Sequence, residues 1–191
     1  MVHRSGYDAV ISNKHDDIKN AKSLILPGVG HFARSMELLD EFDLINLLND
    51  EVILRKKKIL GICLGMQMMT RHSEEGDCMG LGWVEASTVK FKNEEGMDIR
   101  IPHMGWNSVD FVQSGPITND MPEYSRFYFV HSYYVQCERP KDVLAYSQHG
   151  KKIVSAFQKD NIIGVQFHPE KSHKYGLTLI RNFCNLHESK A

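Results

Sequence analysis

The sequence predicts an α/β fold built on a doubly wound, mixed sheet, with antiparallel strands in the C-terminal half. In the first part, short apolar runs alternate with segments whose apolar residues recur at helical spacing, which is typical of a parallel sheet covered by helices on both faces. In the second part, apolar runs follow one another through short connections, which favours antiparallel pairing. No repeat, low-complexity tract or linker interrupts the 191 residues, so we expect a single domain over residues 1–191.

The first part contains three expected buried strands, at Asp8–Ser12, Ser23–Leu26 and Lys58–Cys63. Between the second and third, helical spacing of apolar residues predicts one interrupted helix or two over His31–Arg55. A further helix, Gly65–His72, is expected to leave the third strand. Each strand is therefore expected to be followed by a helix that packs on one face of the sheet.

The second part is rich in strands and ends in an amphipathic helix, Ser172–His187, with Ser172 as its N-cap. The connection Lys159–Asn161 suits a hairpin turn. Six strands are expected, at Val84–Phe91, Gly105–Phe111, Arg126–Gln136, Val143–Ser147, Lys152–Phe157 and Ile162–Phe167.

Composition narrows the classes of function. Charged residues make up 25% of the chain and the net charge is −1, so no basic face for a phosphate backbone is indicated. No apolar run approaches the roughly 18 residues of a membrane span, and the first residues lack the apolar stretch of a secretory signal. The cysteines are widely spaced and indicate free thiols in a reducing cytosol, so we expect a cytoplasmic protein. They are Cys63, Cys78, Cys137 and Cys184.

A candidate nucleophile lies where the third strand meets the next helix, in the sequence Gly61-Ile62-Cys63-Leu64-Gly65. A strand, a tight turn and a helix in this order are typical of a nucleophile elbow, with cysteine where many hydrolases have serine. The flanking glycines allow the strand and helix to pass closely, and the helix N-terminus favours a thiolate. The alternative is a buried structural cysteine beside packing glycines.

A candidate base and its orienting carboxylate follow the last strand, in His168-Pro169-Glu170. Residues two apart in an extended chain point to the same side, so the imidazole and the carboxylate can project together. A carboxylate fixes the tautomer of a neighbouring imidazole and stabilises its protonated form, as in a Cys-His-acid triad. The alternative is a surface turn.

A metal site is a weaker interpretation. His168 and Glu170 could supply two ligands, but the other histidines lack the spacing typical of zinc sites. The possible third ligands are His103, His131, His149 and His173.

These motifs together resemble the triad (class I) glutamine amidotransferases, a family with a doubly wound, flavodoxin-like sheet. The segments that carry the resemblance are Pro27-Gly28-Val29-Gly30, Gly61-Ile62-Cys63-Leu64-Gly65-Met66-Gln67 and Gly164-Val165-Gln166-Phe167-His168-Pro169-Glu170-Lys171-Ser172. Two further segments narrow it to the glutaminase subunits of imidazole glycerol phosphate synthase: Pro102-His103-Met104-Gly105-Trp106-Asn107 and Tyr128-Phe129-Val130-His131-Ser132-Tyr133-Tyr134-Val135.

The resemblance implies that Cys63 attacks the side-chain amide of glutamine, releasing ammonia and leaving a glutamyl thioester that water hydrolyses. It implies an oxyanion hole at Gly28, Val29 and Leu64, and no cofactor or metal. The positions that match the family's contacts to the α-amino and carboxylate groups of glutamine are Gln67, His131, Ser132 and Tyr133.

The resemblance also implies a partner, a synthase/cyclase subunit of (β/α)8-barrel type that receives the ammonia. Tyr134 and Lys171 match positions near that interface. His103 and Trp106 either frame the site or interface or pack in the core, and packing alone accounts for Tyr128 and Phe129.

The start of the chain departs from the family pattern. Family members open with a strand and a glycine-rich loop, whereas this chain begins with one turn, Val2–Ser5, followed by Gly6. One interpretation is an ordinary N-terminus without a regular element. The resemblance favours a truncated or mis-started chain, which would leave neighbouring strands unpaired.

The sequence therefore predicts a glutaminase subunit of histidine biosynthesis that hydrolyses glutamine through Cys63, His168 and Glu170 and passes ammonia to the synthase. A paralogous subunit in the synthesis of surface sugars is the first alternative, kept open by the segment Gly80–Trp83. A non-catalytic subunit that binds the partner is the second. A free-standing cysteine peptidase or hydrolase is the third.

Overall fold

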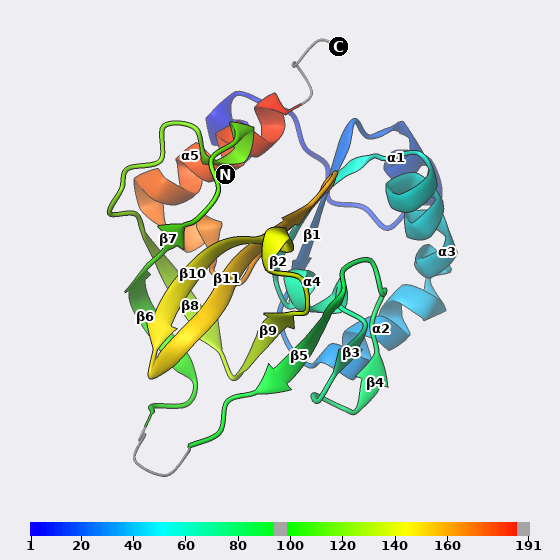
Figure 1. Ribbon diagram of the computed structural model, residues 1–191. Helices are drawn as coiled ribbons and strands as arrows, with labels where there is room; N and C mark the ends of the chain where they lie inside the picture. Colours follow the sequence, from blue (N-terminus) through cyan, green and yellow to red (C-terminus); the bar gives the residue numbers. More distant parts are fainter. Residues whose placement is uncertain (94–98, 187–191) are drawn as a thin grey trace.

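The computed structural model describes residues 1–93 and 99–186 and shows a mixed, curled sheet with helices on both sides (Figure 1). Three parallel strands lie next to one another in the order β1 (Ser23–Gly28), β2 (Lys58–Cys63) and β12 (Ile162–Val165). The long strand β11 (Lys151–Lys159) then joins β12 in antiparallel orientation. This arrangement confirms the predicted α/β fold with an antiparallel C-terminal half.

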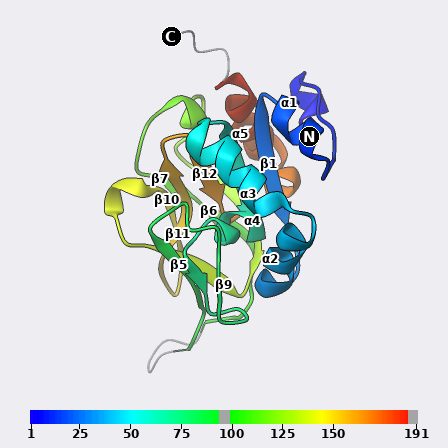
Figure 2. The same cartoon turned by 90° about the vertical axis from the view of Figure 1, so that its right-hand side faces the viewer.

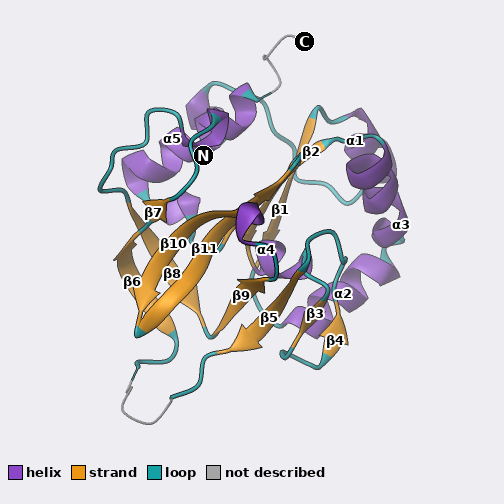
Figure 3. Ribbon diagram, in the orientation of Figure 1, coloured by secondary structure: helices purple, strands orange, loops and turns teal. Residues whose placement is uncertain are grey.

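The antiparallel half has two branches and a separate small sheet (Figure 3). From β11 the main sheet continues through β9 (Tyr133–Cys137), β5 (Ala86–Lys90), β3 (His72–Ser73) and β4 (Cys78–Met79). On the other branch β10 (Val143–His149) pairs with β11, and β7 (Asp110–Phe111) pairs with β10. The two-stranded sheet consists of β6 (His103–Ser108) and β8 (Arg126–His131).

Helices cover the two faces of the parallel strands, as Figures 1 and 2 show. On one side lie α1 (His15–Asn20), α2 (Phe32–Glu41), α3 (Leu44–Asn49) and the π-helical turn η2 (Asp50–Leu54). On the other lie α5 (His173–Asn185) and the short turn η1 (His3–Ser5). The short helix α4 (Leu64–Met68) leaves β2, and three single turns complete the list: η3 (Pro116–Thr118), η4 (Pro140–Asp142) and η5 (Pro169–Lys171).

Side-chain alternation along β2 creates two cores. Ile59 packs in the cluster formed with the side chains of α1, α2 and α3. Leu60 and Ile62 point the other way, into the cluster formed with α5 and β8. Because successive strand residues face opposite sides, one apolar strand supports both layers and places its last residue at the carboxyl edge of the sheet.

One predicted strand is wrong. Asp8–Ser12 forms no strand, and the side chains of Val10 and Ile11 are exposed. A strand exists only where a neighbour completes its hydrogen bonds, and within the described residues β1 pairs with β2 alone. The apolar pattern of residues 8–12 is that of a buried strand, but here it has no partner.

The boundaries of several other elements can be compared with the expected ones. The interruption expected in the helical segment His31–Arg55 is confirmed and lies at Asp43, where φ is 54°. The expected strand Gly105–Phe111 is two strands in different sheets, and Arg126–Gln136 divides at Ser132 into β8 and β9. The expected helix Gly65–His72 ends at Met68.

The predicted hairpin turn at residues 159–161 is confirmed, with Asp160 at φ 53° between β11 and β12. The C-terminal helix is also confirmed as α5; the predicted end at His187 lies outside the described residues.

Candidate active site

Cys63 stands on the strained turn that the sequence predicts. It is the last residue of β2, with φ 54° and ψ −109°, and α4 begins at the next residue. A positive φ is uncommon for a residue with a side chain and persists only where the surroundings impose it. Its strand neighbour in register is Gly28 of β1, so the thiol lies at the carboxyl edge of two parallel strands.

The glycines around Cys63 are required by close packing. A Cβ on Gly65 would lie 1.8 Å from the carbonyl oxygen of Leu26, and one on Gly61 would lie 2.8 Å from the backbone of Gly65. Helix α4 therefore packs directly against β1 and β2, with no room for side chains between them. This contact holds the turn, and with it the thiol, in place.

His168 and Glu170 form the pair that the motif predicts. The Nδ1 atom of His168 lies 2.7 Å from Oε1 of Glu170. Because a carboxylate accepts, Nδ1 carries a proton, and the ring in its neutral form presents Nε2 as a base. That Nε2 is buried and makes no hydrogen bond of standard geometry.

The electrostatics couple His168 to Cys63. Interaction with the Cys63 thiol and then the hydrogen bond with Glu170 raise the pKa of His168 to about 9, against an ordinary value of 6.5. Burial opposes both effects. Partial burial also acts to raise the pKa of the Glu170 carboxyl, but the hydrogen bond from His168 and its charge outweigh it and leave that pKa lowered. The imidazole is therefore suited to accept a proton from the thiol.

Ser172 fixes the backbone of the base. Its hydroxyl donates to the carbonyl of His168 at 2.6 Å and accepts from the backbone N–H of Tyr128 at 3.0 Å. The N–H of His168 in turn donates to the carbonyl of Tyr128 at 2.8 Å. Ser172 is the N-cap residue of α5, as predicted, but its side chain makes no capping hydrogen bond to the helix. The hydroxyl joins the base to β8 instead.

Gln166 is a site residue that the sequence argument missed. Its Nε2 donates to the sulfur of Cys63 at 3.7 Å, and its Oε1 accepts from Nε2 of Gln67 at 3.0 Å. Its side chain is fully buried. The available signal was the position of Gln166 within the apolar strand expected at Ile162–Phe167. A buried side-chain amide there requires a hydrogen-bond partner.

Gln67 and the segment His131–Tyr133 come together as the motifs suggest. Nε2 of Gln67 donates to the carbonyl of Tyr133 at 3.0 Å, and Nδ1 of His131 lies 2.6 Å from the same oxygen. Ser132 lies in the break between β8 and β9, and its carbonyl accepts from the backbone N–H of Phe91. Gln67 of α4 and His131 of β8 therefore meet at the carbonyl of Tyr133 in β9.

The segment expected to supply the oxyanion hole lies against the first turn of α4. A Cβ on Gly28 would lie 2.9 Å from Cβ of Leu64 and 3.0 Å from the backbone nitrogen of Gly65. Leu64 is buried, whereas the side chain of Val29 is exposed. The backbone of the Pro-Gly-Val-Gly segment therefore runs past the residue that follows the nucleophile.

The two expected interface residues differ in accessibility. Tyr134 is 4% exposed and its ring stacks on Phe91 at 4.6 Å, so it is a core residue that presents no surface to a partner. The expected interface role of Tyr134 is wrong for this reason. Lys171 is exposed, and its Nζ lies 5.6 Å from the centre of the Tyr128 ring.

Trp106 is half-exposed and its ring stacks parallel to His173 at 5.4 Å. It therefore belongs to the surface around Lys171 rather than to the core. His103, by contrast, is buried beside His131.

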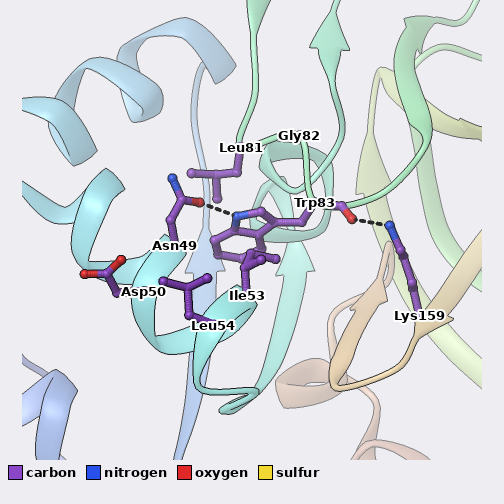
Figure 4. Close-up of a pocket in the computed structure, with 8 residues that line it drawn as sticks. All are labelled: Asn49, Asp50, Ile53, Leu54, Leu81, Gly82, Trp83 and Lys159. Carbon is purple, nitrogen blue, oxygen red and sulfur yellow. Dashed lines mark hydrogen bonds between the residues drawn. The ribbon is translucent and has the colours of Figure 1, made fainter.

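A cavity of about 450 Å³ lies elsewhere, between α3, η2 and the loop before β5 (Figure 4). Trp83 donates from Nε1 to Oδ1 of Asn49 at 2.7 Å, and Lys159 donates to the carbonyl of Trp83 at 2.9 Å. None of the predicted site residues lines this cavity. Leu81 and Gly82 do line it, so the segment Gly80–Trp83 lies partly here.

Within residues 1–93 and 99–186, no group of three or more His, Cys, Asp and Glu side chains could hold a metal ion. Over the same part of the chain, no helix is long and apolar enough to cross a membrane. All four cysteines are free thiols.

Fold and site are those of an α/β protein with a cysteine on a strained strand–helix turn beside a His-Glu pair, and comparison with known proteins identifies the family. The model of the class-I glutamine amidotransferase family matches residues 2–186. The chain belongs to this family and is a glutamine amidotransferase.

Similar proteins carry a more specific name. The chain is 50% identical over 183 residues to "Imidazole glycerol phosphate synthase subunit HisH 2" of Methanococcus maripaludis, covering 96% of this chain and 90% of that protein. It is 44% identical to the subunit of the same name from Pseudomonas aeruginosa, covering 97% and 91%. It is 46% identical to "subunit HisH 1" from a Campylobacter jejuni strain, covering 92% and 87%.

Solved structures share the fold at lower identity. A glutamine amidotransferase crystal structure superposes with a TM-score of 0.74 at 19% identity, covering 98% of this chain and 90% of that one. The glutaminase domain of Trypanosoma brucei CTPS with bound acivicin superposes with a TM-score of 0.62 at 16% identity, covering 93% and 75%.

Proposed function

We propose that this chain is the glutaminase subunit of an imidazole glycerol phosphate synthase and supplies ammonia for histidine biosynthesis. The observation that carries the chemistry is Cys63 on its strained turn, coupled to the buried Nε2 of His168, whose Nδ1 is held by Glu170. The relatives at 44–50% identity, matched over nearly their whole length, support the pathway.

The reaction uses Cys63 as nucleophile. His168 takes the thiol proton, and the thiolate attacks the side-chain amide carbon of L-glutamine. The proton passes from His168 to the departing nitrogen, so that ammonia leaves and a glutamyl thioester remains. His168 then removes a proton from water, which attacks the thioester and releases glutamate. Glu170 holds the ring orientation through both steps.

The backbone around Gly28, Val29 and Leu64 is proposed to bind the oxyanion of the tetrahedral intermediate. The close approach of Gly28 to Leu64 supports it, since backbone N–H groups of both segments can then converge beside the sulfur. Leu64 is also the first residue of α4, where N–H groups have no partner within the helix.

Gln67 is proposed to bind the α-ammonium group of glutamine. Both hydrogens of its side-chain amide are used, by Tyr133 and Gln166, so its carbonyl oxygen is the group left for a ligand. An acceptor suits an ammonium group. The backbone of the segment His131–Tyr133 is proposed to hold the carboxylate beside it.

The proposed partner is a synthase/cyclase subunit of (β/α)8-barrel type. Lys171, Trp106 and Met104 support a docking surface on this side, because all three are exposed and two are large apolar side chains. The four free thiols support a cytosolic location.

The test is a glutaminase assay on the chain mixed with the synthase/cyclase subunit from the same genome. Glutamate release should depend on that subunit and on Cys63. Release that persists in Cys63→Ala would contradict the proposal.

A second candidate is a paralogous subunit that feeds an amidotransfer in surface-sugar synthesis. The names of similar subunits end in the numbers 1 and 2, which indicates organisms with more than one such subunit. This supports a second candidate, since two subunits in one organism can serve different pathways. Complementation of a histidine auxotroph that lacks its own glutaminase subunit separates the two: growth without histidine supports the first candidate, and no growth by an active glutaminase supports the second.

A further inference from the structure

A row of hydrogen bonds runs from the small sheet into the glutamine site. Nδ2 of Asn107 lies 3.0 Å from Nε2 of His103, and Nδ1 of His103 lies 2.9 Å from Nε2 of His131. Nδ1 of His131 lies 2.6 Å from the carbonyl oxygen of Tyr133. His103 and His131 are register partners on β6 and β8, so the pairing of these strands sets the row.

Groups at both ends of the row fix every proton in it. At one end, Oδ1 of Asn107 accepts from the N–H of Ser108 and Nδ2 donates to the carbonyl of Gln148, so Nδ2 can only donate to Nε2 of His103. His103 must then carry its proton on Nδ1 and donate to His131.

The other end gives the same answer. The carbonyl of Tyr133 only accepts, so His131 carries its proton on Nδ1 and accepts at Nε2. The two ends agree, and both imidazoles are neutral Nδ1–H tautomers.

The surroundings keep both rings neutral. The ring of His103 lies between those of Phe129, at 4.5 Å, and His149, at 4.1 Å. Burial, and then the neighbouring His149, lower the pKa of His103 to about 4. Burial, and then His103, lower the pKa of His131 to about 3, and His149 and His168 act in the same direction. The row therefore persists through the physiological pH range.

The row ends on the atom that orients Gln67. The carbonyl of Tyr133 accepts from both His131 and Gln67, and the second amide hydrogen of Gln67 goes to Gln166, which reaches the sulfur of Cys63. A shift of the His131 ring would therefore move the Tyr133 carbonyl and the amide of Gln67 with it.

We propose that His103 is a positioning residue for glutamine binding, acting through the bond from its Nδ1–H to His131. Without this donor, Nε2 of His131 becomes a buried acceptor with no partner, and the ring turns to find one. The carbonyl of Tyr133 then loses its fixed direction. This role rests on the proposed glutaminase function and adds to it a residue that touches neither glutamine nor the thiol.

Two substitutions separate the hydrogen bond from simple packing. His103→Phe keeps an aromatic ring between Phe129 and His149 but removes the donor. His103→Asn loses the ring but can place an amide N–H near the position of Nδ1. A packing role predicts that the phenylalanine variant is the better enzyme, whereas a positioning role predicts the asparagine variant.

The experiment measures KM and kcat for glutamine in the complex with the synthase subunit, and the rate at which iodoacetamide alkylates Cys63. We expect His103→Phe to raise KM roughly tenfold or more, the effect of leaving one buried acceptor unpaired. His103→Asn should recover most of that loss. The alkylation rate should stay within about twofold in both variants, because Cys63 and His168 are untouched.

Nitrogen NMR of histidine-labelled protein gives a readout that needs no turnover. The wild type should show Nδ1–H tautomers for His103 and His131, and His103→Phe should change the signals of His131. An Nε2–H tautomer at either ring, or an unchanged KM in an active His103→Phe complex, would overturn the positioning role. A wild-type complex without glutaminase activity would contradict the proposed function instead. The NMR signals would then still test whether the hydrogen bonds between Asn107, His103, His131 and Tyr133 run in the stated directions.

Discussion

Nδ1 of His168 and Oε1 of Glu170 lie 2.7 Å apart, two residues apart in sequence, across Pro169. The side chain of Glu170 is 48% exposed, whereas that of His168 is buried. The carboxylate thus remains partly hydrated and ionised while it holds the ring from its outer side. The inner nitrogen, Nε2, is left for the thiol.

This asymmetry predicts unequal losses on substitution. His168→Ala should lower kcat by more than about a hundredfold, because it removes the imidazole that interacts with Cys63 and is proposed to take the thiol proton. Glu170→Gln should lower kcat by a smaller factor, since the imidazole stays in place. Steady-state kinetics of both variants in the complex make the comparison. A larger loss in Glu170→Gln would reverse the roles assigned to the two side chains.

The raised pKa of His168 predicts an alkaline limit to activity. The imidazolium must protonate the amide nitrogen as it departs as ammonia, so kcat/KM should fall as the pH rises through about 9. Glu170→Gln removes one of the two main causes of the raised pKa, so its alkaline limb should move to lower pH. Profiles of kcat/KM from pH 6 to pH 10 give the alkaline limbs of the wild type and of Glu170→Gln. If the two limbs superimpose, Glu170 does not raise the pKa of His168.

The same shift contributes to stability. The pKa of His168 is about 9 in the folded chain and 6.5 ordinarily, so the folded state holds this proton more tightly. The contribution is present in full below about pH 6.5 and is lost as the pH rises through about 9. His168→Phe should therefore flatten the decline of Tm over this window. An identical decline in the wild type and in His168→Phe would assign the effect to other groups.

The contact between α4 and β1 predicts a strong effect of a single methyl group. In Gly65→Ala the new Cβ would meet the carbonyl of Leu26, which should cost about 3 kcal/mol and lower Tm by roughly 10 °C. Gly115→Ala is the matched control, because nothing lies within 4 Å of that position and its φ is 177°. Equal melting temperatures for the two variants would mean that α4 moves away from β1 without cost.

Substitution of Gln166 should weaken the binding of glutamine. Gln166→Leu keeps the size of the side chain but removes the acceptor for Gln67 and the donor to Cys63, so KM for glutamine should rise and the alkylation rate of Cys63 should change. Gln158→Leu on the neighbouring strand β11 is the control. If both variants keep the wild-type KM and alkylation rate, Gln166 serves packing alone.

The sequence predicted the parts of the site that depend on neighbours in the chain. Gly61, Cys63 and Gly65 form one turn, and His168 and Glu170 are two residues apart, so their geometry follows from local rules. Tyr134 was misassigned because its exposure is set by Phe91, which lies 43 residues earlier in the chain. The position of Tyr134 in a motif gives no information on whether an aromatic ring from a distant segment will cover it.

Long-range pairing explains the other differences. The apolar pattern at Asp8–Ser12 predicts a strand, but a strand also needs a partner, and no described strand pairs there. Ser172 precedes a helix and was expected to cap it, yet Tyr128 of β8 and the carbonyl of His168 take its hydroxyl. Gln166 was hidden for the same reason, since its two partners come from other elements.

The central claim is that Cys63 is the nucleophile that attacks glutamine, and selective labelling tests it most directly. The complex is treated with 6-diazo-5-oxo-L-norleucine, an electrophilic glutamine analogue, and the modified thiols are located by mass spectrometry. We expect one label, on Cys63, in competition with glutamine and absent from His168→Ala. Burial raises the pKa of Cys137 to about 12 and also raises the pKa values of Cys78 and Cys184, so these thiols should stay unmodified. Equal labelling of all four cysteines, with glutaminase activity surviving in Cys63→Ala, would contradict the claim.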